Sequence, residues 1–536
     1  MNNQGVGMPD VKLPNGISAV IHLPADPPYP LKKFYQIAGS LFNQFEQKVE
    51  LIILDEKNDP AVETEISRMN TEANKVQFIK GNFNTLGSWL NEARKNSTGA
   101  YLLYVDNTTA EVFLHRSALA AMLLVFERNP NCGMVYSDYE IQSGNTAKEM
   151  RLLKHHTGRV RDNQDYGRVF LFSKHILSVC KGFDNSLKYN TLYDIRLKIA
   201  EHAELSHISN RYAGSLYRVH AEGKGHNVFD YLMAGKDSQI EAEKVLTAHL
   251  KRINAYLKAG IFYQKRPAPK KTPPIKASVI IPVNNRARFI GTAIESVLNQ
   301  SIHDIECIVV VNGGPDDPTI GAVQDYMPGG KKYDPQKPEV RLLILDINNI
   351  GLCLNLGTKA ARGEFYVQLD SDDRLKPDAV KKILEVFRSD PKIGIVIGSY
   401  EVWQLDDTNG RIDRVDSIPV VTHDEWTEEN GRNNLLRING AGAPRSIPFQ
   451  VIKDIGYFGI NDEPFARNYG EDYEMVLKIS ERHRVGRVWE PIYDVVRHSG
   501  GTDHSIDQVT IDRNDEAKDF MRMEAIARRQ IMNKKS

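Results

Sequence analysis

Cysteine is scarce in this sequence. The four cysteines, Cys132, Cys180, Cys307 and Cys353, are far apart along the 536 residues. Their spacing therefore matches neither a paired metal site nor the disulfide framework of a small secreted domain. We expect buried thiols in a protein that stays in a reducing compartment.

Long apolar runs are also missing. No stretch approaches the length of about 18 residues that spans a bilayer. The N-terminus, "MNNQGVGMPDVKLPNG", lacks the basic and then apolar regions of a signal peptide. We therefore expect the protein to be made and kept in the cytoplasm.

Neither sign of charge is in excess, because 69 Lys and Arg residues balance 69 Asp and Glu residues. No global field then favours nucleic acid or an anionic membrane, and we expect no nucleic-acid partner. At 41% hydrophobic residues the composition is that of a globular protein. The length suggests roughly two to four domains.

The chain is punctuated near its middle by "FYQKRPAPKKTPPIKAS", a stretch rich in proline and lysine. An amphipathic helical pattern precedes it, so we expect residues 223–276 to be a helix and a stiff linker. This segment would join a first domain at 16–222 to a second at 277–505. Residues 506–536 would form a basic helical tail.

Both domains begin with a β-branched run that includes a proline, "ISAVIHLP" in the first and "ASVIIPV" in the second. Helical segments alternate with further buried strands in each. That alternation predicts an α/β fold in which helices cover both faces of a parallel sheet.

The two domains also repeat one another in order. Asp194 precedes His220 by 26 residues, and Asp472 precedes His498 by 26 residues (220 − 194 and 498 − 472). We interpret this agreement as an internal duplication.

In the second domain, acidic residues follow a buried strand in "GEFYVQLDSDDRLKPDAV". In an open α/β sheet, ligands lie beyond the carboxyl ends of the strands. Asp370 and Asp372 would share one side and could hold Mg²⁺ or Mn²⁺ against a diphosphate. The alternative is an acidic turn in which Asp373 caps the next helix.

The first domain has Asp106 at the matching place, but Asn107 and Thr108 follow it. Threonine supplies no negative ligand, so a diphosphate would be poorly neutralised there. We therefore expect this site to be weakened in the first domain.

Four blocks of the second domain resemble, in order, those of family 2 inverting glycosyltransferases of the GT-A fold. The blocks are "SVIIPVNNRARFIGTAIESVLNQ", "IVVVNGG", "NIGLCLNLGTKAARGEFYVQLDSDDRLKPDA" and "YGEDYEMVLKI". The first domain looks like the same Rossmann-like, nucleotide-diphospho-sugar transferase fold with weakened motifs. We expect it to be a degenerate domain used for packing, acceptor positioning or dimerisation, and a second, metal-independent transferase remains open. The resemblance implies two tandem GT-A modules of the bacterial surface-polysaccharide type, joined by the helix and the Pro/Lys-rich linker.

The resemblance also implies roles for the matched residues. Asp472 would be the general base, with Glu471 as the alternative, and His498 would join Asp370 and Asp372 at Mn²⁺ or Mg²⁺. The nucleotide-sugar site would comprise Pro282, Val283, Asn284, Arg286, Asn312, Asp317, Asp370 and Ser371. Asn312 and Gly313 stand where the family has two acidic residues, so Asp316 or Asp317 would have to replace them.

The implied activity is metal-dependent, inverting transfer of a sugar from a nucleotide sugar, with UDP the commonest carrier. The acceptor would be a hydroxyl of a glycan or of a lipid-linked, surface-polysaccharide precursor. Three alternatives stay open: a bifunctional polymerase with both modules active, a non-catalytic carbohydrate-binding scaffold, and a nucleotidyltransferase that releases pyrophosphate.

The tail carries Arg528, Arg529, Lys534 and Lys535 on an amphipathic helical pattern. We expect it to pack on its own domain or on a partner. Peripheral contact with the inner face of an anionic membrane is the alternative. A homo-oligomer is left open.

Overall fold

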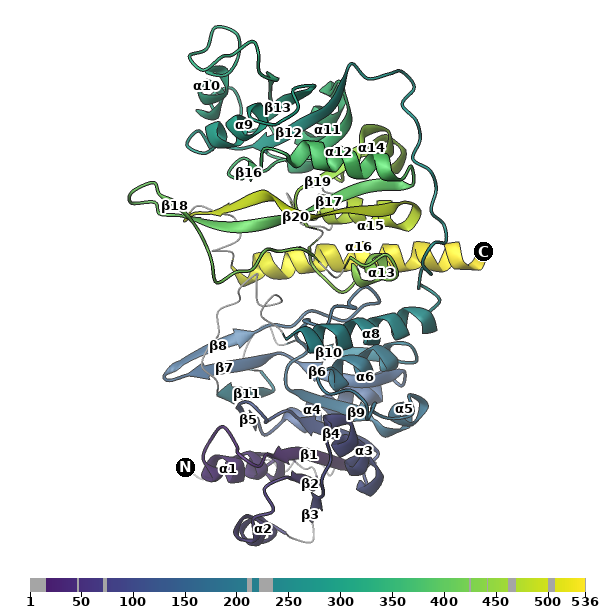
Figure 1. Cartoon of the computed structure of the whole chain (residues 1–536). Helices are drawn as coiled ribbons and strands as arrows, with labels where there is room; N and C mark the ends of the chain where they lie inside the picture. The colour runs from purple at the N-terminus through teal and green to yellow at the C-terminus, as the bar shows by residue number, and fades with distance from the viewer. Residues whose placement is uncertain are drawn as a thin grey trace. The chain divides into compact units, whose positions relative to one another are not determined.

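The computed structural model divides the chain into two compact units, an N-terminal unit of residues 1–249 and a C-terminal unit of residues 250–536 (Figure 1). The division lies inside the segment 223–276 that was predicted to join two bodies. The structure describes residues 16–45, 48–70, 75–209, 215–220, 235–423, 426–440, 442–460, 469–499 and 507–535.

The N-terminal unit alternates strands with helices, as the sequence predicts. Its strands are β1 (Ile17–Leu23), β2 (Val49–Asp55), β3 (Lys75–Lys80), β4 (Tyr101–Val105), β5 (Glu111–Leu114), β6 (Cys132–Ser137), β7 (Tyr139–Ser143), β8 (Thr146–Met150), β9 (Val169–Ser173), β10 (Glu204–Ile208) and β11 (Tyr217–His220). Its helices are α1 (Leu31–Phe42), α2 (Pro60–Ser67), α3 (Leu86–Asn96), α4 (Ala118–Arg128), α5 (Lys174–Val179) and α6 (Thr191–Ala200), and α8 (Lys236–Arg252) crosses the division.

The C-terminal unit follows the same alternation. Its strands are β12 (Ile275–Val283), β13 (Ile305–Val311), β14 (Glu339–Ile344), β15 (Gly363–Gln368), β16 (Arg374–Leu375), β17 (Ile393–Leu405), β18 (Ile412–Arg414), β19 (Arg445–Pro448) and β20 (Arg484–Arg497). Its helices are α9 (Ile290–Leu298), α10 (Thr319–Gln324), α11 (Ile350–Ala360), α12 (Ala379–Ser389), α13 (Gly431–Asn434), α14 (Phe449–Ile455), α15 (Glu471–Arg482) and α16 (Gln508–Lys535).

The main sheets of the two units have the same strand order. Over seven strands it is β3-β2-β1-β4-β9-β6-β10 in the N-terminal unit and β14-β13-β12-β15-β19-β17-β20 in the C-terminal unit, where β16 continues the sheet beyond β20 and β18 pairs with β17. The first four strands of each order are parallel, as predicted, but β9 and β19 run antiparallel to both neighbours. The sheets are therefore mixed, which differs from the expected all-parallel arrangement.

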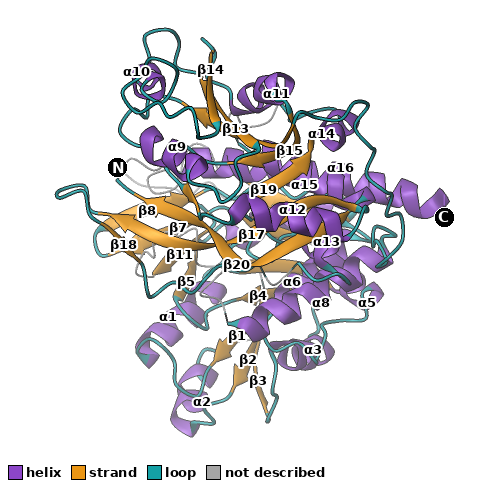
Figure 2. Cartoon of the chain, turned by 45° about the horizontal axis from the view of Figure 1, so that its top comes forward, coloured by secondary structure: helices purple, strands orange, loops and turns teal. Residues whose placement is uncertain are grey.

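Helices cover both faces of the C-terminal sheet (Figure 2). Helices α9 and α12 share one hydrophobic core with side chains of β12 and β13, including Val279 and Val309. On the opposite face, α11 approaches closely at Gly357, where an added Cβ would lie 2.8 Å from Ile280. The unbroken apolar runs of these strands follow from burial on both sides.

A buried hydrogen-bond network recurs in both units. In the C-terminal unit, Ser278 donates to Glu306 Oε1 (2.6 Å) and accepts from the Gly363 N–H (3.0 Å). In the N-terminal unit, Ser18 donates to Glu50 and accepts from the Gly99 N–H (2.9 Å). The repeat seen in the sequence therefore extends to side-chain contacts between strands.

The C-terminal helix α16 packs on α15 within the C-terminal unit. Lys518, Arg522 and Arg529 are only 7%, 0% and 0% exposed. Arg528 Nε lies 3.0 Å from Glu481 Oε2. The tail therefore packs on its own unit. Arg528 and Arg529 do not form the exposed basic face that membrane contact would need.

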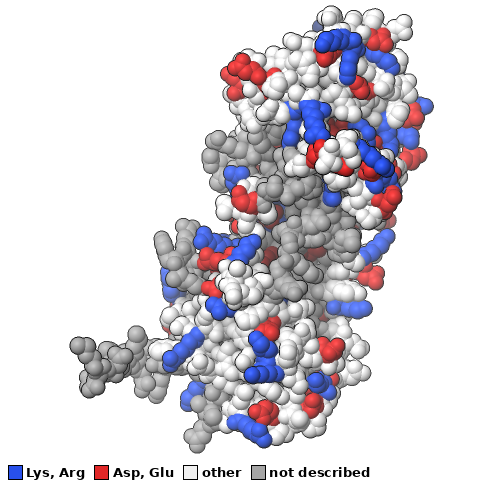
Figure 3. Space-filling view, turned by 90° about the vertical axis from the view of Figure 1, so that its left-hand side faces the viewer, with Lys and Arg blue, Asp and Glu red and all other residues white. Residues whose placement is uncertain are grey.

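Charge is mixed on the surface as well as in the sequence. Figure 3 shows Lys and Arg interspersed with Asp and Glu over the described residues of one face. In the described parts of the chain, no helix is both long enough and apolar enough to cross a membrane.

Candidate active site

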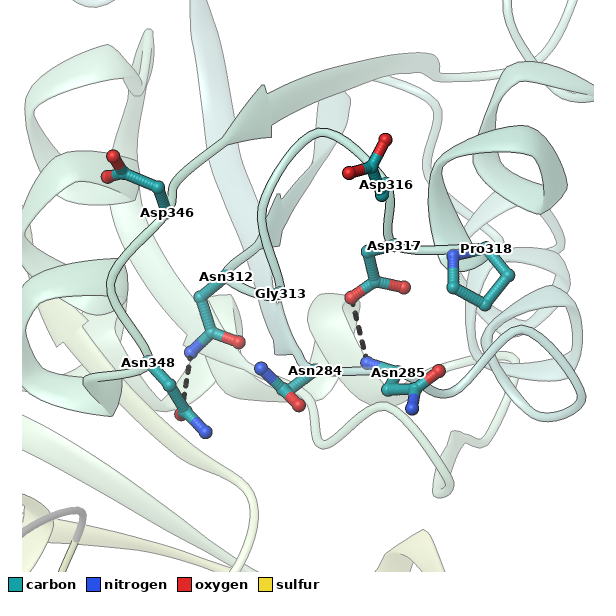
Figure 4. Close-up of a pocket in the computed structure, with 9 residues that line it drawn as sticks. All are labelled: Asn284, Asn285, Asn312, Gly313, Asp316, Asp317, Pro318, Asp346 and Asn348. Atoms are coloured by element: carbon teal, nitrogen blue, oxygen red, sulfur yellow. Dashed lines mark hydrogen bonds between the residues drawn. The ribbon is translucent and has the colours of Figure 1, made fainter.

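The carboxyl ends of β12, β13 and β14 surround a pocket of about 390 Å³ in the C-terminal unit (Figure 4). Polar side chains come from the loop that follows each strand. The lining residues are Asn284, Asn285, Asn312, Gly313, Asp316, Asp317, Pro318, Asp346 and Asn348. This is the edge of the sheet at which ligands of open α/β folds bind.

Asp317 shapes the pocket wall. One carboxylate oxygen accepts from the Asn285 N–H and the other from the Thr319 N–H, each at 2.8 Å. Burial favours the neutral acid, but these hydrogen bonds outweigh it and hold the pKa of Asp317 below its usual value. The carboxylate predicted to read a base thus already receives two backbone amides. Asp316 lies beside it and is exposed.

The position of the Asp317 carboxylate requires glycine at residue 313, because a Cβ there would lie only 2.2 Å from Asp317 Oδ2. Asn312, also predicted for the site, is 5% exposed and donates to Asn348 Oδ1 at 3.3 Å (Figure 4). The predicted residues Pro282, Val283 and Arg286 belong to the same strand and loop but lie outside the pocket lining.

Sequence reasoning missed Asp346 and Asn348. Both follow β14, the strand next to β13 in the sheet. The rule that ligands lie at carboxyl ends of strands would have found them, because β14 ends at the same edge as β12 and β13.

Asp372 and His498 meet, as predicted. His498 Nε2 lies 2.9 Å from Asp372 Oδ2, and its ring stacks on Phe289 with centroids 4.2 Å apart. Asp370 and Ser371 precede Asp372 at the end of β15. Burial and the nearby charge of Asp372 raise the pKa of Asp370 to about 6, against the opposing effect of Arg445.

These residues fit a divalent cation. Repulsion between Asp370 and Asp372 is what a bound cation would relieve. Two carboxylates plus phosphate oxygens of a substrate form a ligand set that Mg²⁺ takes. Within the described residues, no group of three or more His, Cys, Asp or Glu side chains is placed to hold a metal ion, so the predicted ligands Asp370, Asp372 and His498 do not form a three-residue site by themselves. The substrate would therefore have to complete the coordination.

Asp373 does not cap the following helix, contrary to the alternative drawn from the sequence. It is 7% exposed, and its carboxylate accepts from the Val496 N–H of β20 at 2.8 Å. Helix α12 begins at Ala379 with Asp378 at its N-cap position. Asp373 instead fixes the acidic turn against β20.

Glu471 and Asp472 form the first turn of α15, after Gly470 in a left-handed conformation (φ 88°). Asp472 Oδ2 lies 3.0 Å from Arg445 Nη2. Burial disfavours the Asp472 carboxylate, but the positive charges of Arg445 and Lys518 outweigh it and lower the pKa of Asp472.

The neighbouring Glu471 is shifted in the opposite direction. Burial, and then the charge of Asp472, raise the pKa of Glu471 to about 8. The pKa values of these adjacent carboxyl groups are therefore shifted apart. Adjacent carboxyl groups with separated pKa values are a common arrangement for acid and base roles.

Arg445 and Lys518 were missed by sequence reasoning. Arg445 begins β19, and the charges of Asp472 and Asp370 both raise its pKa. Lys518 comes from α16, 46 residues after Asp472 (518 − 472), and donates to the Tyr469 hydroxyl at 3.0 Å. No local sequence signal connects either residue to the acidic pair, because tertiary packing brings them together.

The N-terminal unit lacks a counterpart of Asp472, which corrects the alignment made from sequence. Asp194 is the fourth residue of α6 and pairs with Lys198 at 2.6 Å. The fourth residue of α15 is Glu474, which pairs with Lys478 at 2.5 Å. Asp194 thus corresponds to Glu474, and the position of Asp472 is occupied by Leu192.

The histidine match is also displaced by two residues. Leu114 of β5 faces Tyr217 of β11, and Leu375 of β16 faces Tyr493 of β20. His220 lies three residues after Tyr217, whereas His498 lies five residues after Tyr493. Residue 222, the position equivalent to His498, lies outside the described residues.

Arg445 has no basic counterpart either. Val396 of β17 faces Ser446 in the C-terminal unit, and Val135 of β6 faces Leu171 in the N-terminal unit. The residue before Leu171 is Phe170, so phenylalanine occupies the position of Arg445. The N-terminal unit has therefore replaced an arginine and an aspartate with apolar residues.

Comparison with known proteins identifies one part of the chain. Residues 278–451 match the family model described as "Glycosyl transferase family 2". This match, together with the mixed α/β architecture, agrees with the GT-A fold that the sequence blocks imply.

Three curated relatives are similar to longer stretches, over 192, 296 and 225 residues. The chondroitin synthase of Escherichia coli is 31% identical over 34% of this chain and 26% of its own length. That of Pasteurella multocida is 30% identical over 53% of this chain and 28% of its own length. The hyaluronan synthase of Pasteurella multocida is 29% identical over 42% of this chain and 21% of its own length. The chain thus spans about a quarter of each relative.

Proposed function

Because the chain belongs to glycosyl transferase family 2 through residues 278–451, we propose that its C-terminal unit is a glycosyltransferase. It would transfer a sugar from a nucleotide-sugar donor to a hydroxyl group of a glycan. The observation that supports this most is the contact of 3.0 Å between Arg445 Nη2 and Asp472 Oδ2, with Glu471 beside Asp472 in the first turn of α15.

Asp472 is the proposed general base. A sugar hydroxyl is a weak nucleophile, and a positioned carboxylate that accepts its proton accelerates attack on the anomeric carbon. The low pKa of Asp472 keeps the carboxylate ready, and Arg445 restricts its orientation. Direct displacement by the acceptor hydroxyl would invert the anomeric centre.

Asp370, Asp372 and His498 are proposed to lie against the donor diphosphate. A divalent cation bound there, Mn²⁺ or Mg²⁺, would neutralise the charge that develops on the leaving nucleoside diphosphate. His498 holds Asp372 in place through the 2.9 Å contact. Buried Asp373 fixes the same turn through Val496.

The pocket at the ends of β12, β13 and β14 is proposed to hold the nucleotide. Its asparagine and aspartate side chains offer donors and acceptors for a base and a ribose. We propose UDP as the carrier. The metal, the base and these contacts are all part of the proposal.

The acceptor is proposed to be a growing glycan. The relatives named above are a hyaluronan synthase and two chondroitin synthases, so oligosaccharides of those polymers are the first acceptors to test. A bifunctional polymerase is less well supported, because Leu192 and Thr108 replace the base and the second metal carboxylate in the N-terminal unit.

A donor screen tests the proposal. The full chain is incubated with nucleotide sugars and a chondroitin oligosaccharide, with and without Mn²⁺, and released nucleoside diphosphate is measured. We expect release with at least one donor, dependence on the cation, and loss in Asp372→Asn. Release of pyrophosphate would indicate a nucleotidyltransferase, and glycan binding without any release would indicate a scaffold.

A further inference from the structure

The N-terminal unit contains a pocket of about 460 Å³ of its own. His22 of β1, Glu56 after β2 and Asp106 after β4 line it, so it lies at the carboxyl ends of these strands. Leu192 and Tyr193 at the start of α6 also contribute. The pocket thus occupies the edge at which the C-terminal unit has its proposed active site.

The lining of this pocket is rich in aromatic side chains. Phe83, Trp89, Tyr104, Tyr189 and Tyr193 all contribute to it. Phe83 and Trp89 pack together with ring centroids 4.5 Å apart. Tyr189 is 49% exposed, so its ring is accessible to a ligand. The pocket in the C-terminal unit has no aromatic residue in its described lining.

Three lining residues carry buried polar atoms that lack a hydrogen-bond partner within the described structure. They are His22 Nδ1, Trp89 Nε1 and the Tyr104 hydroxyl. The three residues are 7%, 2% and 0% exposed. A buried polar group without a partner costs free energy, so a polar ligand that shifts these lining side chains would gain by pairing with their polar atoms.

The acidic turn of this pocket has one carboxylate fewer than the turn of the C-terminal unit. Thr108 stands at the position of Asp372 and donates through Oγ1 to Asp106 at 2.7 Å, and Arg168 Nη1 lies 3.5 Å from the same carboxylate. The turn therefore offers a cation-bound diphosphate fewer ligands than Asp370 and Asp372 do.

We propose that this pocket is a saccharide-binding site that takes a glycan carrying no nucleotide diphosphate. Aromatic faces pack against the apolar C–H faces of pyranose rings. Sugar hydroxyls both donate and accept, so they can satisfy an indole N–H, a phenol and an imidazole together. The pocket's chemistry is independent of transfer by the C-terminal unit. The choice of glycan rests on the proposed function, because the glycan is taken to be the acceptor that the C-terminal unit extends.

Calorimetric titration of the full chain tests the proposal with three probes: a chondroitin hexasaccharide, uncharged chitohexaose, and UDP with Mn²⁺. Tyr189→Ala removes an exposed lining ring, and we expect about five- to tenfold weaker binding of at least one oligosaccharide. UDP binding should be unchanged. Tyr333→Ala is the matched control, since Tyr333 is a 43% exposed tyrosine of the C-terminal unit.

Tyr104→Phe separates binding from folding. Because the Tyr104 hydroxyl lacks a protein partner, its removal should leave the melting temperature unchanged or raise it. Glycan affinity should nevertheless fall by a factor of about three to ten. A glycan affinity equal to that of the wild type in both Tyr189→Ala and Tyr104→Phe would overturn the proposal.

The same titrations distinguish a glycan from a nucleotide sugar as the ligand of this pocket. If UDP-sugars with Mn²⁺ bind in a way that Tyr189→Ala abolishes, the pocket is a donor site and the proposal is wrong. Absence of saturable binding of either oligosaccharide would also refute it. Failure of the proposed transferase function would give a different result from these two outcomes. The chain would then show no UDP binding that Asp372→Asn removes, while Tyr189→Ala would still weaken glycan binding.

Discussion

The N-terminal and C-terminal units order the strands of their main sheets identically, and each has a serine–glutamate–glycine network between strands. Their strand ends differ in chemistry. Where the C-terminal unit has Asp372, Arg445 and Asp472, the N-terminal unit has Thr108, Phe170 and Leu192. Charged groups that depend on one another have been replaced together, while the framework that positions them is kept.

There is a physical reason why the positions of Arg445 and Asp472 are both apolar in the N-terminal unit. A buried aspartate without its arginine would be an uncompensated charge, which is strongly destabilising. Phe170 and Leu192 avoid that cost because neither needs a partner. The comparison therefore teaches that loss of one charged group in such a site favours loss of its partner.

The largest effect that would test the comparison is expected from Asp472→Asn. Removing the proposed base should lower kcat by about 10²- to 10⁴-fold. Asp194→Asn is the matched change in the N-terminal unit, and transfer should stay near the wild-type rate. Comparable losses in both variants would break the assignment of Asp194 to the position of Glu474.

Arg445→Lys should have a smaller effect on the C-terminal site. Lysine keeps the charge but not the planar fork, so we expect kcat/KM to fall about tenfold. Arg445 lowers the pKa of Asp472, so weakening the pair should raise that pKa and move the acid limb of the pH profile to higher pH. Loss of activity with an unmoved acid limb would contradict this role.

Glu471→Gln tests the raised pKa through stability. Folding raises the pKa of this carboxyl from about 4.5 to about 8, so the folded protein retains a proton that the unfolded chain loses between these values. Wild-type stability should thus fall as pH rises through this window. The glutamine variant should lack this loss and melt higher than the wild type at pH 8.5, but not at pH 4.5.

That prediction depends on the environment of Glu471 and not on its chemistry in transfer. Thermal melting of both proteins across pH 4.5 to 8.5 measures it. Identical pH dependence in the two proteins would show that Glu471 is ionised in the folded state.

Gly313→Ala should produce the smallest change. The added Cβ would collide with Asp317, so the loop must shift, and the donor KM should rise by about tenfold or less. Gly321→Ala, where no atom lies within 4 Å of the added Cβ, is the control. An unchanged donor KM in Gly313→Ala would place the nucleotide elsewhere.

Local patterns predicted the framework well. Apolar runs predicted the strands, and Asp370 and Asp372 were proposed because they follow a strand. The proposed roles of Asp472 and His498 came from the family resemblance. The sequence did not show which side chains form ion pairs in the folded structure. Arg445 reaches Asp472 through a sheet register, and the two-residue shift of Asp194 became visible only through its ion pair with Lys198.

Asp317 has contacts that its place in the sequence did not predict. Its carboxylate stands at the right strand end, but both oxygens accept backbone amides of neighbouring loops. An acidic residue that organises a loop and one that meets a ligand have the same local sequence pattern. Hydrogen-bond partners distinguish them, and these come from the folded structure.

The central claim, one nucleotide site per chain, is tested most directly by the stoichiometry of UDP binding. Equilibrium dialysis of the full chain with Mn²⁺ should give one UDP bound per chain, and Asp372→Asn should abolish it. Two UDP molecules per chain, with one retained in Asp372→Asn, would contradict the account and show that the N-terminal unit is also a donor site.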